Sequence, residues 1–284
     1  MKTILVPTDF SPSANNAAAY AFEMAKVIKA DIKLCHALKV PAESIYAAQV
    51  AWPLEDISHL TEGAEAEMKF LTRHIEQNSS SEPSWFKPGI DHSIGVGDTV
   101  DYIRNVVSDD HISLVVMGMS GANLFSRFLL GSVSRELITK ADFPLLLIPK
   151  NYVYKPIKKI AFATDLHHED INTINALAGL ARYFNAELLI SHVEGTHDAE
   201  KKQVKEFLTE VTTRTQYNNI YFRAVKMDKV TDGLQWLSAH GQIDMLVMTH
   251  RKDAFLTQSH CEKLVSETHV PLMVLPNKDI CLII

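Results

Sequence analysis

Apolar residues along the chain alternate between short continuous runs and longer segments with a helical repeat. Thr3–Thr8 and Ile112–Met117 are continuous runs, which predict strands that are covered on both faces of a sheet. Between them, one segment repeats its apolar residues every three or four positions, at Ala64, Met68, Leu71 and Ile75. That spacing predicts a helix. Strands that alternate with helices imply a mainly parallel sheet with helices on both faces.

The pattern occurs twice. An offset of 156 residues brings KTILVPTDF, residues 2–10, onto KKIAFATDL, residues 158–166. The identical pairs have no gap between them: Lys2, Ile4, Thr8, Asp9, Asn16, Ala25, Ala30 and His36 fall on Lys158, Ile160, Thr164, Asp165, Asn172, Ala181, Ala186 and His192. The repeat predicts two copies of one domain, at residues 1–150 and 157–284, joined at Lys150–Ile157.

Composition excludes several classes of protein. Apolar residues make up 46% of the 284 and charged residues 22%, which is typical of a soluble globular protein. The net charge of -6 and the lack of a basic run argue against a nucleic-acid partner. No apolar stretch is long enough to span a membrane, and the start of the chain does not resemble a signal peptide. Three widely spaced cysteines, Cys35, Cys261 and Cys281, form no C-x-x-C, so we expect a reduced, cytoplasmic protein.

A spaced glycine motif follows the apolar run at Ile112–Met117. Gly118, Gly121 and Gly131 with Ser132 read G-x2-G-x9-G-S, and a helix is expected to start at Ser132. We interpret Gly118 and Gly121 as a strand-to-loop turn where backbone N–H groups can approach a ligand. A helix N-terminus at Gly131 suits phosphate, and Arg127 lies in the intervening segment, within reach of one. The chain has no G-K-[ST], so this is not a P-loop.

These segments resemble the universal stress protein family. VPTDFS, VVMGMSGANLFSRFLLGSVSREL and PLLLIP carry the resemblance to its nucleotide-binding branch, and the likeness covers both halves of the chain. The resemblance implies a tandem α/β protein of two flavodoxin- or Rossmann-like domains, similar to the adenine nucleotide alpha-hydrolases. Each domain would hold a five-stranded parallel sheet of order 3-2-1-4-5. Because separate domains of this family pair through their last strands, LLLIP and LMVLP could pair inside one chain.

The resemblance also implies an ATP site at the carboxyl edge of the first sheet, with ADP or AMP as alternatives and with or without Mg²⁺. The adenosine-side loop would be Pro7, Thr8 and Asp9, and Ala37 would contact adenine through its backbone. The ribose and phosphate loop would be Met117, Gly118, Ser120 and Gly121. The phosphate cradle would be Gly131, Ser132, Val133 and Ser134.

The second copy departs from the motif. Thr249 replaces Gly118, Lys252 stands near the position of Gly121, and the Gly-Ser pair is missing. From the strand end to the closing proline, this copy is about four residues shorter. Although Asp165 persists, we predict one nucleotide per chain, in the first copy. His250, Arg251 and Lys252 form a cationic cluster that we interpret as a solvated loop.

No catalytic or metal-binding residue is predicted. His167 and His168 with His192, or His250 with His260, could act as ligands, but no H-E-x-x-H or Cys/His framework supports them. His36 and His192 match between the copies and are interpreted as structural residues.

Three functions stay open at this point. The first is a stress-response regulatory or sensor protein that binds ATP. The second is a slow ATP hydrolase or phosphotransferase, so that any enzyme activity would be at most a weak ATPase. The third is a scaffold that works without nucleotide. The sequence implies neither a nucleic acid nor a membrane as partner, and it leaves a homodimer and a protein partner open.

Overall fold

The computed structural model describes residues 2–39, 55–79, 85–119, 131–194, 200–250 and 268–276. The elements of the first half are β1 (Thr3–Pro7), α1 (Pro12–Ile28), β2 (Asp31–Leu38), α3 (Glu55–Gln77), β3 (Ile90–Val96), α4 (Thr99–Asp109), β4 (Leu114–Met119), α5 (Ser132–Lys140) and β5 (Leu145–Pro149). Those of the second half are β6 (Lys159–Ala163), α6 (Asp170–Phe184), β7 (Glu187–Glu194), α7 (Glu200–Arg214), β8 (Ile220–Lys226), α8 (Val230–His240), β9 (Met245–His250) and β10 (Leu272–Pro276).

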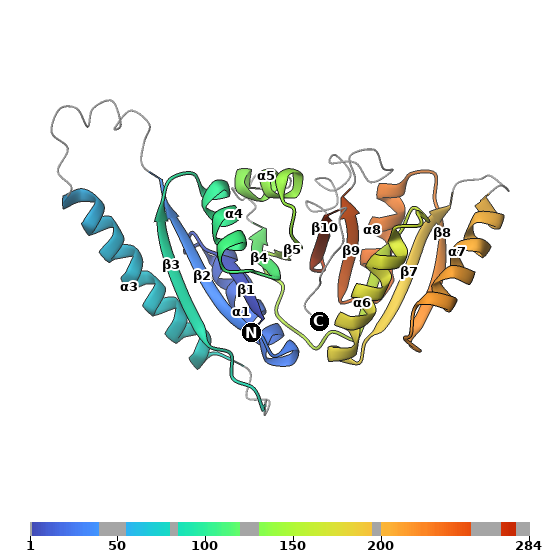
Figure 1. The fold of residues 1–284 in the computed structure, drawn as a ribbon, viewed down its shortest axis with the longest axis horizontal. Helices are drawn as coiled ribbons and strands as arrows, with labels where there is room; N and C mark the ends of the chain where they lie inside the picture. The colour runs from blue at the N-terminus through green and yellow to red at the C-terminus, as the bar shows by residue number, and fades with distance from the viewer. Residues whose placement is uncertain are drawn as a thin grey trace.

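All the described strands join one ten-stranded sheet, in the order β3-β2-β1-β4-β5-β10-β9-β6-β7-β8. Each half keeps the predicted order 3-2-1-4-5 with parallel neighbours, which confirms the fold class. The halves meet where β5 and β10 pair antiparallel, with Leu146 opposite Met273. The expected pairing of the two last strands within one chain is therefore confirmed. Figure 1 shows this junction at the centre, with β3 and β8 at opposite ends.

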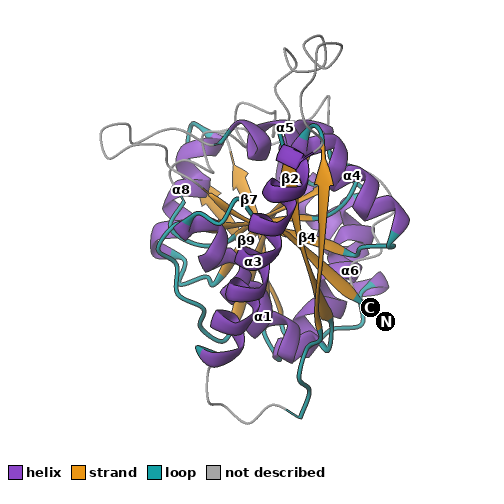
Figure 2. Cartoon of the chain, turned by 90° about the vertical axis from the view of Figure 1, so that its left-hand side faces the viewer, coloured by secondary structure: helices purple, strands orange, loops and turns teal. Residues whose placement is uncertain are grey.

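Helices cover both faces of the sheet (Figure 2). One face packs against α1, α3, α6 and α7, through side chains such as Ala21, Met68, Ile171 and Phe207. The other face packs against α4, α5 and α8, through Ile103, Leu137 and Leu234. Residues of both halves share each of these cores. The strands read as continuous apolar runs because both of their faces are buried in this way.

Local signals in the sequence fix where α1 begins and ends. The Ser11 hydroxyl accepts a hydrogen bond from Ala14 N at 3.2 Å, and Pro12 occupies the first turn. The helix ends at Lys29, which adopts a left-handed conformation with φ 57°. This sharp start places the N-terminus of α1 directly after the carboxyl end of β1. The loop between them, Thr8–Phe10, is therefore held at the edge of the sheet.

The seam, which is the segment Lys150–Ile157 that joins the two halves, is held in place by hydrogen bonds. Asp244 accepts hydrogen bonds from the backbone N–H groups of Lys158 and Lys159 at 2.8 and 3.0 Å. Asn16 donates to the carbonyls of Pro149 and Tyr152 at 3.3 and 3.1 Å. Ile157, at the end of this segment, is 2% exposed. The seam therefore contributes to the core that the halves share.

Some boundaries differ from those the sequence predicted. Strand β4 runs on to Met119 and pairs Gly118 with Ile148, so Gly118 lies inside the strand and not in the turn that follows. Helix α3 begins at Glu55, before the predicted start. The predicted helix Thr257–Thr268 lies almost wholly outside the described residues, as does the apolar tail ICLII. Within the described part of the chain, no helix is both long enough and apolar enough to cross a membrane.

Candidate functional site

A pocket of about 490 Å³ opens at the carboxyl ends of β1, β2 and β4 in the first half. Ten of the predicted site residues line it: Pro7, Thr8, Asp9, Ala37, Met117, Gly118, Gly131, Ser132, Val133 and Ser134. The other three, Ser120, Gly121 and Arg127, lie outside the described residues. The structure thus brings together segments that are more than 120 residues apart in the sequence. Their meeting point is the edge where ligands bind in open α/β sheets.

The loop after β1 is held by hydrogen bonds to its own side chains. The Thr8 hydroxyl accepts from Phe10 N at 2.9 Å, and Asp9 Oδ1 accepts from Ser11 N at 3.0 Å. Phe10 adopts a left-handed conformation with φ 59°, which turns the chain sharply into α1. The Asp9 carboxylate is consequently kept at the rim of the pocket.

The end of β2 supplies the wall beside this loop. His36 places Nδ1 2.8 Å from the Thr8 carbonyl, and its ring centroid lies 4.7 Å from that of Phe10. His192 makes the matching contact with Thr164 O at 2.9 Å in the second half. Both histidines therefore tie a β-strand end to the neighbouring loop, which agrees with a structural role.

The sequence did not single out the contribution of α4 to the pocket. Thr99, Tyr102 and Ile103 line it. The Tyr102 ring lies so close to Gly95 on β3 that a Cβ at Gly95 would overlap the ring. Gly95 belongs to the segment GVGDTV, residues 95–100, in which Asp98 caps α4. Tyr102 and Gly95 could have been noticed only with the register of β2 and β3 in hand.

The N-terminus of α5 forms the other end of the pocket. Gly131 is its N-cap residue, and the bond from Arg135 N to Gly131 O, at 3.0 Å, is the one that closes its first turn. Ser132, Val133 and Ser134 lie within this first turn, ahead of the first residue whose N–H finds a carbonyl in the helix. Their own N–H groups therefore have no acceptor within the helix. Together with the positive end of the helix dipole, these donors suit an anionic group.

Gly118 also has a packing role that the sequence did not reveal. A Cβ on this residue would overlap the backbone carbonyl of Ser13, in the first turn of α1. The glycine therefore allows α1 to pack against β4, which in turn places the loop of Asp9 beside the pocket. Gly118 itself lines the pocket, and its contact with a ligand stays a prediction.

Cys35 lines the same pocket but is 1% exposed. Burial raises the pKa of its thiol from 9.0 to about 12. Since the thiolate is the reactive form, this cysteine is inert at neutral pH. It contributes an apolar surface to the pocket and no nucleophile.

The equivalent position in the second half is filled. There the space beside Thr164 and His192 measures only about 10 Å³. Val193 takes the place of Ala37, and its strand partner Val225 takes the place of Gly95. Gly233 stands where α4 has Tyr102, and a Cβ on it would lie 2.8 Å from Val193. The valines thus occupy the room that the first half leaves open.

Two further exchanges accompany the filled pocket. Asp170 stands where the first half has Ala14 and is fully buried. Thr164 donates to its Oδ2 at 2.6 Å, and Thr249, which replaces Gly118, donates to its Oδ1 at 3.5 Å. Of the predicted cationic cluster, Arg251 and Lys252 lie outside the described residues.

Comparison with known proteins agrees with this architecture. The family model described as "Universal stress protein family" matches residues 1–149. Universal stress protein MJ0531 of Methanocaldococcus jannaschii is 28% identical over 149 residues, which are 52% of this chain and 82% of that protein. Universal stress protein MJ0577 of the same organism is 25% identical, over 52% of this chain and 95% of that protein.

A solved structure extends the likeness to both halves. The crystal structure of a universal stress protein from Archaeoglobus fulgidus superposes with a TM-score of 0.73 and 18% identity. The superposition covers 97% of this chain and 98% of that one, so the likeness in fold extends over both halves. Because the family model spans more than half of the residues, the identification rests on sequence as well as on fold. The chain belongs to the universal stress protein family.

Proposed function

We propose that the first half binds one adenine nucleotide, ATP in particular, and that the protein acts as a nucleotide-dependent regulatory or sensor protein in a stress response. The observation that carries the proposal is the contrast between the two equivalent positions. The pocket in the first half measures about 490 Å³, and the space in the second half about 10 Å³. Small-molecule sites commonly measure about 300–1,000 Å³.

The chemistry of the lining supports a nucleotide. One end has apolar walls from Ala37, Leu38, Tyr102 and Ile103, which suit a planar base. The other end has the N-terminus of α5 with the hydroxyls of Ser132 and Ser134, which suits phosphate. Asp9 lies at the rim beside the first end, where it could accept hydrogen bonds from ribose or from the base. Adenine is the base that the resemblance to the family implies.

Binding without rapid turnover is the form of the proposal that the lining favours. Asp9 is the one carboxylate among the described residues of the pocket, and its Oδ1 already accepts from Ser11 N. Hydrolysis needs a base or a positioned water near the γ-phosphate. We therefore propose that ATP occupancy itself is the signal, with hydrolysis slow in comparison.

The test begins with freshly purified full-length protein. It is denatured, and the released nucleotides are counted per chain by chromatography. Calorimetric titrations of stripped protein with ATP, ADP, AMP, cyclic AMP and GTP, each with and without Mg²⁺, then follow. We expect one adenine nucleotide per chain, with weaker binding of GTP. No released nucleotide and no heat with any of the five ligands would refute the proposal.

Gly131→Val provides the matched variant. Gly131 has φ -58° and ψ 149°, a conformation open to any residue, so its backbone does not require glycine. The added side chain should block the approach of phosphate to α5 and weaken ATP binding at least about tenfold, the loss of one good contact. Val193→Ala, in the second half, is the control and should leave the stoichiometry at one. Unchanged ATP binding by Gly131→Val would exclude this end of the pocket as the phosphate site.

A further inference from the structure

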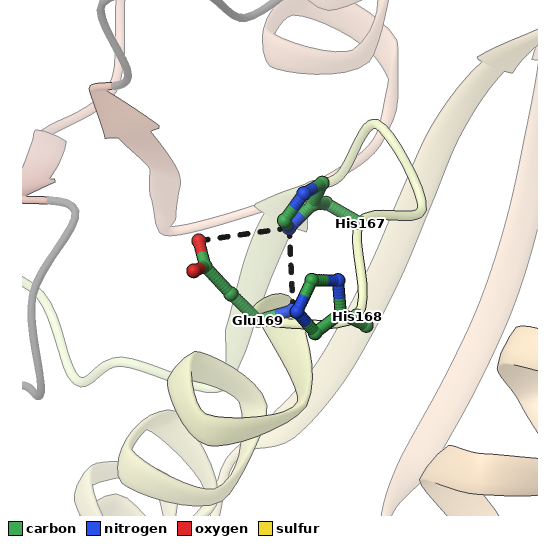
Figure 3. Close-up of side chains that lie close together, drawn as sticks. All are labelled: His167, His168 and Glu169. Atoms are coloured by element: carbon green, nitrogen blue, oxygen red, sulfur yellow. Dashed lines mark hydrogen bonds and ion pairs between the residues drawn. The ribbon is translucent and has the colours of Figure 1, made fainter.

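The loop between β6 and α6 gathers three side chains that can bind a metal ion. His167, His168 and Glu169 are consecutive, and Figure 3 shows them facing one another at the start of α6. The 156-residue offset aligns them with Ser11–Ser13, which begin α1 and border the nucleotide pocket. At the same place in the fold, the second half therefore carries two imidazoles and a carboxylate where the first half has two serines and a proline.

Their spacing approaches that of a coordination shell. One ligand atom from each residue lies within 4.8 Å of the others. His167 Nδ1 and Glu169 Oε2 are 3.6 Å apart. Two ligands bound to zinc at about 2.0–2.2 Å in tetrahedral geometry lie about 3.4 Å from each other. The distance within that pair therefore suits a shared ion once the His167 ring turns its Nδ1 lone pair away from Glu169 N, and rotation of the His168 side chain would complete the set.

Two groups of Glu169 lie beside the same nitrogen of His167. The backbone N–H of Glu169 donates to His167 Nδ1 at 3.3 Å, and Glu169 Oε2 lies 3.6 Å from that nitrogen. The single lone pair of Nδ1 can serve either the backbone N–H or a metal ion, so a metal bound at Nδ1 would displace this long hydrogen bond, and one bound at Nε2 would leave it intact. A proton would join only His167 and the Glu169 carboxylate, whereas a metal ion would also use the adjacent His168, whose ring centroid is 4.3 Å from that of His167.

Backbone hydrogen bonds and the Asp165 carboxylate help to hold the loop in this shape. Asp170 N donates to His167 O at 2.9 Å, and Ile171 N donates to His168 O at 3.3 Å. His167 N donates to Asp165 Oδ1 at 3.3 Å. The side chains of His167 and Glu169 remain 42% and 47% exposed, so an ion can reach them and water can complete its coordination. The site is thus open and largely formed in advance.

We propose that His167, His168 and Glu169 bind one divalent transition-metal ion, for which zinc is the appropriate probe. Two imidazoles and a carboxylate suit zinc and its neighbours in the first transition row, whereas Mg²⁺ and Ca²⁺ prefer sites built of oxygen ligands. The second half, whose nucleotide position is filled, then carries a metal site on the equivalent loop. This inference does not depend on nucleotide binding by the first half.

The experiment uses the untagged full chain, stripped of metal with a chelator and titrated with zinc against a chromophoric competitor. The test variants are the double variant His167→Ala/His168→Ala and the single variant Glu169→Gln. His59→Ala/His240→Ala is the matched control, since both of its histidines are exposed and lie on other helices. Thermal melts without metal check that each variant folds, as substitutions at exposed sites should allow.

We expect the unchanged protein to bind one zinc ion per chain. Both test variants should bind none, or bind it at least about tenfold more weakly. The control should bind like the unchanged protein, and excess Mg²⁺ should not compete. His168→Ala separates a metal site from a simple ion pair: it must weaken zinc binding at least as much as Glu169→Gln. Equal zinc binding by the unchanged protein and the His167→Ala/His168→Ala variant would overturn the proposal.

Discussion

The Ser13 carbonyl in α1 occupies the space that a side chain on Gly118 in β4 would need. The two residues are 105 positions apart, yet their backbones touch because a glycine stands in the strand. This approach lets the first turn of α1 lie directly on the sheet. The Asp9 loop, which precedes α1, is carried to the rim of the pocket as a result.

Gly118→Ala should therefore destabilise the protein. The new Cβ meets backbone atoms, which cannot rotate away, so α1 has to move at a cost of about 1–3 kcal/mol or more. Urea unfolding should show the loss as a lower midpoint at an unchanged slope. Gly63→Ala is the control, because α3 leaves nothing within 4 Å of a Cβ there. It should stabilise the helix by about 0.5–1 kcal/mol. A stable Gly118→Ala variant would contradict this account of the packing.

The seam between the halves gives a second prediction. Asp244 is 8% exposed and accepts from two backbone N–H groups, at Lys158 and Lys159. Asp244→Ala should cost about 2–4 kcal/mol, since it leaves both donors without an acceptor. Lys155 also contacts Asp244, at 2.9 Å, but its side chain is 54% exposed. Lys155→Ala should therefore cost less than about 1 kcal/mol. Similar losses in the two variants would show that the ion pair matters more than the backbone bonds.

The buried thiol of Cys35 gives a prediction about pH. In the unfolded chain this thiol loses its proton above about pH 9, whereas in the folded protein burial raises its pKa to about 12. Its contribution to stability is thus complete below pH 9 and is lost as the pH rises from 9 to 12. Relative to Cys35→Ala, the unchanged protein should lose on the order of 1 kcal/mol in its free energy of unfolding between pH 8 and pH 10.

Urea unfolding of both proteins at pH 8, 9 and 10 measures that difference. Alkylation provides an independent check: iodoacetamide at pH 8 should leave Cys35 unmodified in the folded protein and modify it after denaturation. If Cys35 reacts readily in the folded state, the thiol is more accessible than its 1% exposure indicates.

Much of this fold could be predicted from the sequence, because its strands are buried on both faces and its helices are amphipathic. Helix α6, Asp170–Phe184, for example, buries Ile171, Ile174 and Ala178 at the spacing that periodicity detects. The strand order could be inferred from family resemblance but not from the pattern alone. Hydrophobic periodicity reports which residues are buried, and it carries no information on which strands are neighbours.

The part of the site that escaped prediction depends on contacts between distant elements. Ala37 faces Gly95 across β2 and β3, and Tyr102 from α4 lies on that glycine. In the second half, Val193 and Val225 are larger than Ala37 and Gly95, and Gly233 is smaller than Tyr102. No one of these residues, taken alone in the sequence, predicts an open or a filled pocket. The prediction requires the register of the strands, which places the three residues of each half together.

The last prediction concerns a similar exchange at the start of α6. Asp170 and Thr249 stand where the first half has Ala14 and Gly118, and Thr249 donates to the buried carboxylate. Thr164 donates to it as well, at 2.6 Å. Asp170→Ala removes the acceptor and leaves both threonine hydroxyls buried without it. The free energy of unfolding should fall by about 1–3 kcal/mol for each hydroxyl that finds no other partner.

Asp170 and Thr249 replace Ala14 and Gly118 of the first half. If these two replacements depend on each other, Asp170→Ala should lower the free energy of unfolding less in a Thr249→Gly background than in the unchanged protein. The coupling energy from a double-mutant cycle in urea should lie at about 0.5–3 kcal/mol, the range for residues in direct contact. The double variant Asp170→Ala/Thr249→Gly also restores the residue pair of the first half at this position. If the free-energy losses of the two substitutions simply add, the hydrogen bond to Thr164 is the one that stabilises Asp170. Thr249 then contributes nothing to the stability of the carboxylate.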